Sequence, residues 1–283
     1  MKQNLYIITA KTNMHVGSGD SDLGVIDSRV QRDVLNDYPT IFSSSLKGAL
    51  REHFESRQEL TNEEITVIFG GSGESKDDMS AGQYKFFTGN LLSYPVRSTE
   101  RPFYRAITLE MVKEFLDYIK VFNIEFDTEG VLHSFCNAIK KLLEKHPIFI
   151  IDDVSNGKKV IIEDSVVDCV ERNAIENLNA IENIFGKNLV IYSSDAFKTV
   201  VENLPIIARN KLVGGKSENL WYEELIPRET KFYFSILNTK IDDNNDLFEK
   251  FNEKLVNEIV QIGANASIGQ GYTKIERFGE LNE

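Results

Sequence analysis

Roughly 30 residues separate the first strand pattern of this chain from its first helical pattern. Residues 5–12 are apolar and β-branched, which is typical of a buried strand. The first amphipathic helical pattern begins only near residue 45. A connection of this length is uncommon inside a compact domain, and long loops usually carry function. We therefore expect residues 13–44 to form a long functional loop that the rest of the fold holds in place.

Two glycines and one aspartate make this loop a candidate site. Gly17 and Gly19 form a glycine turn at its start, and Asp27 lies in the irregular segment that follows. Glycine lets a backbone approach a ligand closely, and a carboxylate can bind a hard cation or take part in proton transfer. We interpret the loop as a site for a phosphate backbone, with Asp27 as the candidate catalytic carboxylate. An aspartate that caps a turn gives the same local sequence.

The helix after the loop carries two cations near its start. Ser45 is predicted to be the N-cap, and Lys47 and Arg51 lie four residues apart on the solvent-facing side. Free amides of the first turn, the helix dipole and these cations together suit a phosphate group. An ordinary amphipathic helix with two solvated cations gives the same spacing, so both interpretations stay open.

The net charge argues against nonspecific nucleic-acid binding over the whole surface. The chain has 32 Lys and Arg against 44 Asp and Glu, a formal net charge of −12 at pH 7. Residues 1–51 hold six basic and five acidic side chains, a net of +1, so the acidic excess lies in the remaining chain. This distribution is compatible with a local basic track on an acidic body, and also with ordinary charge scatter.

Cysteine usage and hydropathy exclude further classes. Cys136 and Cys169 have no CxxC partner, which argues against a disulfide framework or a cysteine zinc site. No apolar run approaches the roughly 18 residues that a membrane span needs, and the N-terminus lacks a signal-peptide pattern. The sequence therefore predicts a cytoplasmic protein with no membrane partner.

Strand and helix patterns alternate along the remaining chain and predict an α+β fold. Thr108 is predicted to cap a helix that runs to about Phe122. Asn156-Gly157 between two apolar runs predicts a hairpin, and residues 246–262 predict a last helix. The order of elements suggests a ferredoxin-like sheet with a helical insertion at about residues 109–187. No internal repeat is evident, and the length of 283 residues allows one large domain or two ordinary ones.

Residues 205–230 form a second long excursion, which predicts a hairpin arm with a glycine tip. Trp221, the only tryptophan, lies on the returning arm. Such an aromatic residue most often packs against the protein body, although a projecting arm can also stack on bases. Near the C-terminus, Gly269 and Gly271 predict a turn whose free amides can bind an anion, a pattern that ordinary tight turns share.

Several of these segments together resemble the RAMP superfamily of CRISPR proteins, and most of all the repeated backbone subunit of the type III-B (Cmr) effector complex. The matching motifs follow one another along nearly the whole chain: His15-Val16-Gly17-Ser18-Gly19, Gly24-Val25-Ile26-Asp27, Ser44-Ser45-Leu46-Lys47-Gly48-Ala49-Leu50-Arg51, Pro95-Val96-Arg97-Ser98, residues 191–195, Leu220-Trp221-Tyr222-Glu223-Glu224 and Ile268-Gly269-Gln270-Gly271-Tyr272. An ordered set is more specific than any single motif. Residues 41–44 replace the Pro-Gly that usually precedes the serine in this family, so a different helix entry is expected.

The resemblance implies an RRM-like palm with a protruding thumb hairpin at about residues 205–230. It implies a subunit that coats a guide RNA (crRNA) as a filament of copies, joins other CRISPR effector subunits and cleaves complementary target RNA. It also implies a divalent metal, Mg²⁺ or Mn²⁺, while attack by the neighbouring 2′-hydroxyl is the chemistry we expect for the cut. Two alternatives stay open: a noncatalytic scaffold that coats the guide, and the paralogous type III-A backbone subunit.

The same resemblance implies roles for the candidate residues. Asp27 corresponds to the essential carboxylate and metal ligand, and His15, Tyr222 and Glu224 to supporting catalytic groups. The sequence does not choose between Glu223 and Glu224. The candidate RNA-binding positions are Gly17, Gly19, Ser45, Lys47, Arg51, Trp221, Gly269 and Gly271.

Overall fold

The structure is a computed structural model that describes residues 2–21, 25–71, 80–124, 129–153, 160–239 and 245–279. Its helices are α1 (Ser43–Arg57), α2 (Asn62–Phe69), α3 (Leu109–Val121), α4 (Glu129–Leu143), α5 (Leu178–Phe185), α6 (Ser194–Glu202) and α7 (Asn245–Leu255). Its strands are β1 (Lys2–Ala10), β2 (Gly17–Ser21), β3 (Ser28–Val30), β4 (Tyr84–Phe86), β5 (Asn90–Val96), β6 (Tyr104–Thr108), β7 (Ile148–Ile151), β8 (Val160–Ile162), β9 (Ser165–Val170), β10 (Leu189–Tyr192), β11 (Ile206–Val213), β12 (Lys216–Glu224), β13 (Lys231–Asn238), β14 (Ile259–Gln261) and β15 (Tyr272–Arg277).

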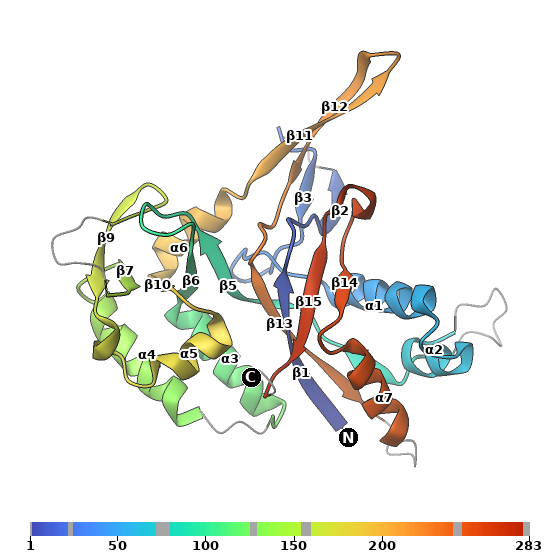
Figure 1. Cartoon of the computed structure of the whole chain (residues 1–283), viewed down its shortest axis with the longest axis horizontal. Coiled ribbons are helices and arrows are strands. Elements are labelled where there is room, and N and C mark those ends of the chain that lie inside the picture. Colours follow the sequence, from blue (N-terminus) through green and yellow to red (C-terminus); the bar gives the residue numbers. More distant parts are fainter. Residues whose placement is uncertain are drawn as a thin grey trace.

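Strand β1 runs through the middle of the molecule between β13 and β15, and both pairs are antiparallel (Figure 1). Its residues alternate between two hydrophobic cores, because successive side chains of a strand point to opposite faces. Tyr6 and Ile8 enter a core with α1, α2 and α7, while Leu5 and Ile7 enter a core with α3, α4 and α5. Both faces of β1 are therefore covered, which explains its continuous apolar sequence.

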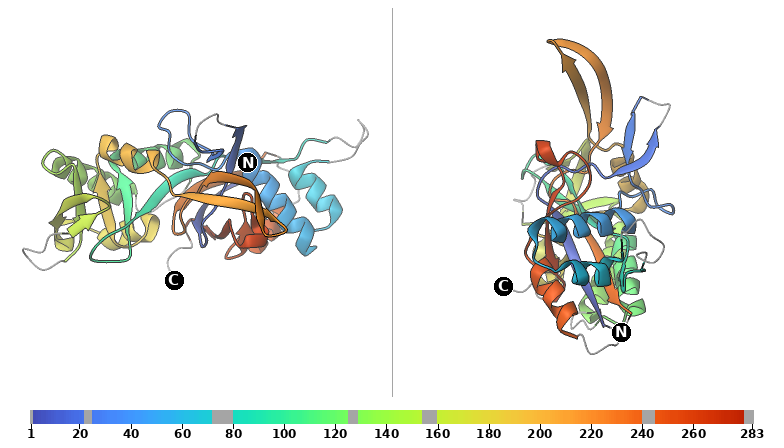
Figure 2. Two further views of the ribbon diagram at one scale, coloured as in Figure 1. Left: turned by 90° about the horizontal axis from the view of Figure 1, so that it is seen from above. Right: turned by 90° about the vertical axis from the view of Figure 1, so that its right-hand side faces the viewer.

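The main sheet continues from β13 through β5, β6 and β10 into the segment that was predicted as a helical insertion. Helix α3 begins after Thr108, whose side chain accepts a hydrogen bond from the Met111 amide, so the predicted cap is confirmed. The segment also contributes β7, β9 and β8 to the sheet edge (Figures 1 and 2). The insertion is thus a mixture of helices and strands.

The hairpin predicted at Asn156-Gly157 is wrong. The dipeptide itself lies outside the described residues, but the strands on either side of it, β7 and β8, are not neighbours. Strand β9 lies between them, parallel to β7 and antiparallel to β8. Pairing with a later segment has overridden the local turn signal.

The last predicted helix is too long. Helix α7 ends at Leu255, and Asn257 then adopts φ 65°, a left-handed conformation that ends the helix. Residues Ile259–Gln261 form β14, which pairs with β15. Ile259 is exposed while Val260 is buried, so the apolar positions that fitted a helical spacing alternate as in a strand.

An ion pair with a buried carboxylate ties the insertion to the main sheet. The Asp152 carboxylate accepts hydrogen bonds from Arg101 Nε at 2.8 Å, Arg101 Nη2 at 3.0 Å and the Tyr104 hydroxyl at 2.6 Å. Burial alone raises the pKa of Asp152, but these hydrogen bonds outweigh it and lower the pKa below its ordinary value. The charged form is therefore the one that the fold stabilises.

Asp152→Asn is expected to lower the free energy of unfolding by about 2 kcal/mol at neutral pH, because Arg101 and Tyr104 lose a charged acceptor. A carboxylate with a lowered pKa stabilises the fold above its unfolded-state pKa, and this stabilisation is lost as pH falls through the folded-state pKa. Urea unfolding at neutral and at acid pH measures the difference in free energy of unfolding between wild type and variant. This difference should be smaller at acid pH. A gap that is independent of pH would contradict this assignment.

Candidate active site

A second sheet, with the order β11-β12-β3-β2, projects from the main body (Figure 1). Strands β11 and β12 form a hairpin that stands clear of the helices in Figure 1 and in the right-hand view of Figure 2. The long loop of residues 13–44 is less irregular than expected, because it contributes β2 and β3. Strand β3 pairs with β12 through Ser28 and Glu223. The predicted loop and the hairpin thus meet in one sheet.

Asp27 is exposed and is held against the hairpin by two hydrogen bonds. Its amide donates to the Tyr222 carbonyl at 3.1 Å, and its Oδ2 accepts from the Tyr222 amide at 2.8 Å. Gly24, which precedes it in the motif, lies outside the described residues. One side of the carboxylate is therefore anchored to backbone, and the group still faces solvent. This geometry suits a carboxylate that acts on a ligand lying along the hairpin.

His15 contacts Ser28, the residue that follows Asp27, and is only 4% exposed. Its Nδ1 is 2.7 Å from the Glu224 carbonyl oxygen, and its Nε2 is 3.0 Å from Ser28 Oγ. Because a carbonyl only accepts, Nδ1 carries the proton, and in the neutral ring Nε2 accepts from the Ser28 hydroxyl. Both nitrogens are used inside the protein, so His15 fixes the residue next to Asp27.

Gly17 has a steric reason to lack a side chain. A Cβ at this position would lie 3.1 Å from His15 Nε2 and 3.7 Å from Ser28 Oγ. Any side chain here would crowd the contact between His15 and Ser28. Gly19 has φ 85° and open space around it, so its glycine serves the backbone turn.

Glu224 is 2% exposed and does not face solvent. Its Oε2 accepts from the Val30 amide at 3.1 Å, and its Oε1 accepts from Arg32 Nη2 at 3.1 Å. Arg32 also donates to the Val201 carbonyl, which links the end of α6 to the same point. Glu224 therefore fastens β3 to β12. The Tyr222 side chain, by contrast, is exposed on the hairpin.

The start of α1 differs from the prediction. The helix begins at Ser43 with Phe42 as the N-cap, and Ser45 lies within the first turn, so the N-cap prediction for Ser45 is wrong. Gln31 holds this entry from outside the helix: its Oε1 accepts from the Phe42 amide at 2.6 Å, and its Nε2 donates to Ser45 Oγ at 2.8 Å. A residue distant in sequence, which sequence reasoning missed, thus fixes the helix entry.

A groove of about 440 Å³ runs beside this helix, lined by Val16, Gly17, Ser45, Gly48, Ala49, Glu52, Gln261 and Gly263. Lys47 is half-buried and makes no ion pair with a described residue. Arg51 is engaged inside the protein, with Glu55 Oε1 at 2.7 Å and the Gly70 carbonyl at 3.2 Å. Lys47 is thus the better placed of the two cations for an external anion.

The remaining candidates lie on the hairpin and on the C-terminal turn. Trp221 is half-buried, with the Arg209 guanidinium 5.3 Å from its ring centre. Gly269 and Gly271 have φ values of 78° and 79°, so both glycines adopt left-handed backbone. Among the described residues, no three His, Cys, Asp or Glu side chains gather closely enough to hold a metal ion.

The family model of the RAMP superfamily matches residues 7–274. The chain belongs to the RAMP superfamily. The mixed α+β class is confirmed as well, because the fold follows that of solved RAMP structures. The match includes the loop, the hairpin and the C-terminal turn, so the three segments that meet at Asp27 and His15 all lie within the family domain.

Two curated RAMP relatives match most of the chain. "CRISPR system Cmr endoribonuclease Cmr4" of Pyrococcus furiosus is 29% identical, over 97% of this chain and 95% of the relative. "CRISPR system CMR subunit Cmr4" of Saccharolobus solfataricus is 27% identical, over 82% of this chain and 83% of the relative.

Two solved structures share the fold. A chain of the type III-B Cmr-beta complex bound to cognate target RNA has a TM-score of 0.77 and 24% identity, with 99% of both chains covered. Oligomeric Cmr4 from Pyrococcus furiosus has a TM-score of 0.69 and 23% identity, with 98% of both chains covered.

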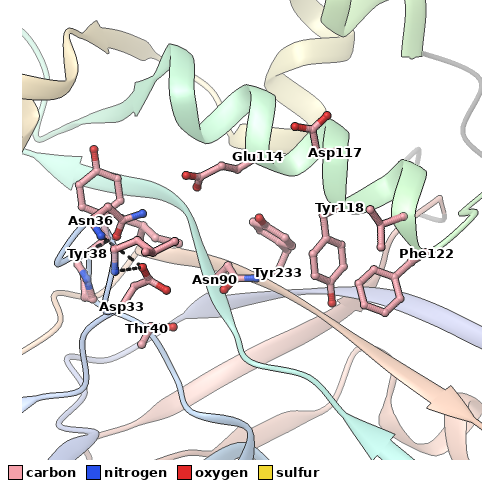
Figure 3. A pocket seen from close by; sticks show the side chains of 14 residues that line it. Asp33, Asn36, Tyr38, Thr40, Asn90, Glu114, Asp117, Tyr118, Phe122 and Tyr233 are labelled. Carbon is pink, nitrogen blue, oxygen red and sulfur yellow. Dashed lines mark hydrogen bonds between the residues drawn. The ribbon is translucent and has the colours of Figure 1, made fainter.

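One acidic pocket of this RAMP protein lies apart from the site. Figure 3 shows Glu114 and Asp117 on α3 and Asp33 on the loop after β3 around a hollow of about 370 Å³, which Tyr118 and Tyr233 also line. Burial and the charge of Asp33 raise the pKa of Glu114. Three carboxylates make this pocket unfavourable for a phosphate group. Along the described chain, no helix is long and apolar enough to span a membrane.

Proposed function

We propose that the protein is a backbone subunit of a type III-B CRISPR ribonucleoprotein, and that it cleaves target RNA paired with the guide. One observation carries this proposal: Asp27 is exposed and fixed to the projecting hairpin by Tyr222, in a chain that resembles a Cmr endoribonuclease over nearly its whole length. Its partners would be crRNA, target RNA, further copies of itself and other effector subunits, in the cytoplasm.

The elements fit a single domain over residues 1–283 that consists of a palm, a thumb hairpin and an insertion. The antiparallel strands β1, β13 and β15 with their helices would be an RRM-like, ferredoxin-like palm. The hairpin of β11 and β12 would be the thumb, and residues 109–187 the insertion. A thumb that stands clear of the body supports a role in separating nucleotides of a bound strand.

Cleavage would use the 2′-hydroxyl of the RNA itself, attacking the adjacent phosphorus in line. The task of the protein is then to hold this geometry and to stabilise the developing charge. Asp27 would orient the 2′-hydroxyl or bind a cation, while His15 and Glu224 hold β3, which Asp27 immediately precedes. Tyr222 supplies the backbone anchor and an exposed phenol beside it.

A divalent metal, Mg²⁺ or Mn²⁺, remains part of the proposal. Mg²⁺ is commonly held by one or two carboxylates together with substrate phosphates and water, so a single exposed carboxylate such as Asp27 fits such an ion. The ion would supply charge stabilisation at the phosphoryl group.

Guide binding would use the groove beside α1, with Lys47, Ser45 and Gly17, and the turn with Gly269 and Gly271. Gly19 and Trp221 would flank the RNA strand, and Arg51 would act through its hydrogen bond to the Gly70 carbonyl.

Lys47→Ala is expected to weaken guide-RNA binding for all sequences and to reduce the slope of log K against log salt by about 0.7, the value for one phosphate contact of a single strand. Arg51→Ala is the matched control, because its guanidinium is already bonded to Glu55 and Gly70. It should leave the salt slope nearly unchanged. Equal slopes for Lys47→Ala and wild type, measured by filter binding at several salt concentrations, would remove Lys47 from the guide track.

The decisive experiment is a product ladder. The assembled complex, purified without other nucleases, is incubated with complementary target RNA in Mg²⁺ or in chelator. Regularly spaced products that need the metal support the proposal. Guide coating with no cleavage would favour the noncatalytic scaffold, and assembly only with type III-A partners would favour the paralogous subunit.

A further inference from the structure

Two consecutive glutamates of β12 point to opposite sides of the hairpin, as strand geometry requires. Glu224 points to β3 and holds Arg32 and the Val30 amide. Glu223 points to the other side, toward the turn of residues 263–271, and is 8% exposed. The sequence did not choose between the two, and the structure gives each a separate set of contacts.

The Glu223 carboxylate accepts hydrogen bonds from three segments of the chain. It accepts from Trp221 Nε1 at 2.7 Å, from Arg209 Nη1 at 3.1 Å and from Asn265 Nδ2 at 3.0 Å. Burial by itself raises the pKa of Glu223, but the hydrogen bonds from Trp221 and Arg209 lower it below its ordinary value. Glu223 is therefore a charged anchor that joins both arms of the hairpin.

Asn265 connects this anchor to the C-terminal turn. Its amide nitrogen also donates to Gln270 Oε1 at 3.0 Å, and its own backbone has φ 68°. The turn is fastened to the segment around His15 as well, since the Ala264 amide donates to the His15 carbonyl at 2.8 Å. The proposed guide-binding turn and the strand that anchors Asp27 are thus parts of one hydrogen-bonded unit.

We propose that Arg209 and Asn265 are positioning residues: through Glu223 they lock the 263–271 turn to β12, so that guide RNA on the turn fixes Asp27 through Tyr222. This inference rests on the proposed function. It explains how guide RNA on the 263–271 turn would control the position of Asp27. Neither residue needs to touch the scissile phosphate. What they set is the position of the β12 backbone, to which Asp27 is bonded at both its amide and its carboxylate.

Asn265→Gly separates this role from a simple folding role. Glycine accepts the left-handed backbone of this position without strain, so the variant removes the amide side chain and keeps the turn. With assembled complexes and saturating target, we expect its single-turnover cleavage rate to fall by about tenfold or more, because small displacements of a catalytic group are costly. Guide affinity, target affinity and melting temperature should stay close to wild type.

Arg209 supplies a second variant and a rescue. Arg209→Ala should reduce the rate as Asn265→Gly does, Arg209→Lys should recover part of it, and the double variant should be no slower than the slower single. Glu218→Gln is the control, since Glu218 pairs with Lys211 near the exposed hairpin tip. It lies away from the contacts of Glu223 with Trp221, Arg209 and Asn265, which together form the junction between the hairpin and the turn. A wild-type rate in Asn265→Gly, or a loss of guide affinity equal to the loss of rate, would overturn the inference.

Trp221 provides a readout that does not depend on cleavage. It is the only tryptophan, and it lies inside the junction between Arg209 and Glu223. Binding of a guide-length single-stranded RNA should protect wild-type Trp221 from acrylamide quenching, and Asn265→Gly should lose this protection while still binding RNA. If wild-type complexes do not cleave target RNA but RNA still protects Trp221 from quenching, the proposed function is contradicted, while the coupling of the turn to β12 is supported. Equal protection in both proteins would refute the junction alone.

Discussion

Asp27→Asn is expected to reduce target cleavage by about 10²-fold or more while guide and target binding remain, because a carboxylate that orients a proton or a cation is lost. Asparagine has nearly the same shape, and its side-chain oxygen can still accept from the Tyr222 amide. The β3 backbone should therefore stay in place. The measurement is single-turnover cleavage by the assembled complex, with guide and target affinities determined in parallel.

The control for Asp27→Asn is again Glu218→Gln. This variant neutralises a carboxylate near the tip of the hairpin to which Asp27 is bonded, far from β3. This variant should cleave at the wild-type rate. Full cleavage by Asp27→Asn would remove Asp27 from the chemistry. A parallel loss of guide binding and cleavage would instead make Asp27 a structural cap of the hairpin.

Gly271→Ala is expected to destabilise the protein by about 3 kcal/mol and to abolish tight guide binding. A left-handed backbone costs a residue with a Cβ about 1–2 kcal/mol, and steric overlap adds to this strain. The new Cβ would lie 2.2 Å from the Ile262 carbonyl oxygen and 2.9 Å from Gln261 Nε2. The backbone of the turn must shift, and the groove beside α1 includes the neighbouring Gln261 and Gly263.

Gly269→Ala is the matched control within the same turn. Its φ of 78° is nearly that of Gly271, but a Cβ there meets no heavy atom within 4 Å. Only the backbone strain applies, so we expect a loss of about 1 kcal/mol and near-normal guide binding. Urea unfolding and filter binding compare the two variants. Similar losses for both would show that backbone conformation, and not the close contact with Ile262, governs the turn.

Local sequence was sufficient where neighbouring residues decide the structure. The apolar run that became β1 and the Thr108 cap of α3 follow from the pattern of a few residues. These features depend little on distant segments, and short-range propensities therefore describe them well.

Distant contacts explain what the sequence could not predict. Ser45 has the chemistry of an N-cap, yet Gln31 bonds the first turn from 14 residues away. The apolar spacing of Ile259 and Ile262 fits a helix until pairing with β15 makes the segment a strand. Glu223 and Glu224 are equivalent in sequence, and only the packing of β12 between β3 and the C-terminal turn separates them.

The alternating side chains of β1 have an evolutionary consequence. Ile7 packs in the core on one side of the sheet and Ile8 in the core on the other side, although the two residues are adjacent in sequence. Substitutions that do not share partners are close to additive. Lineages can therefore change the packing on one face of β1 while the packing on the opposite face stays as it is.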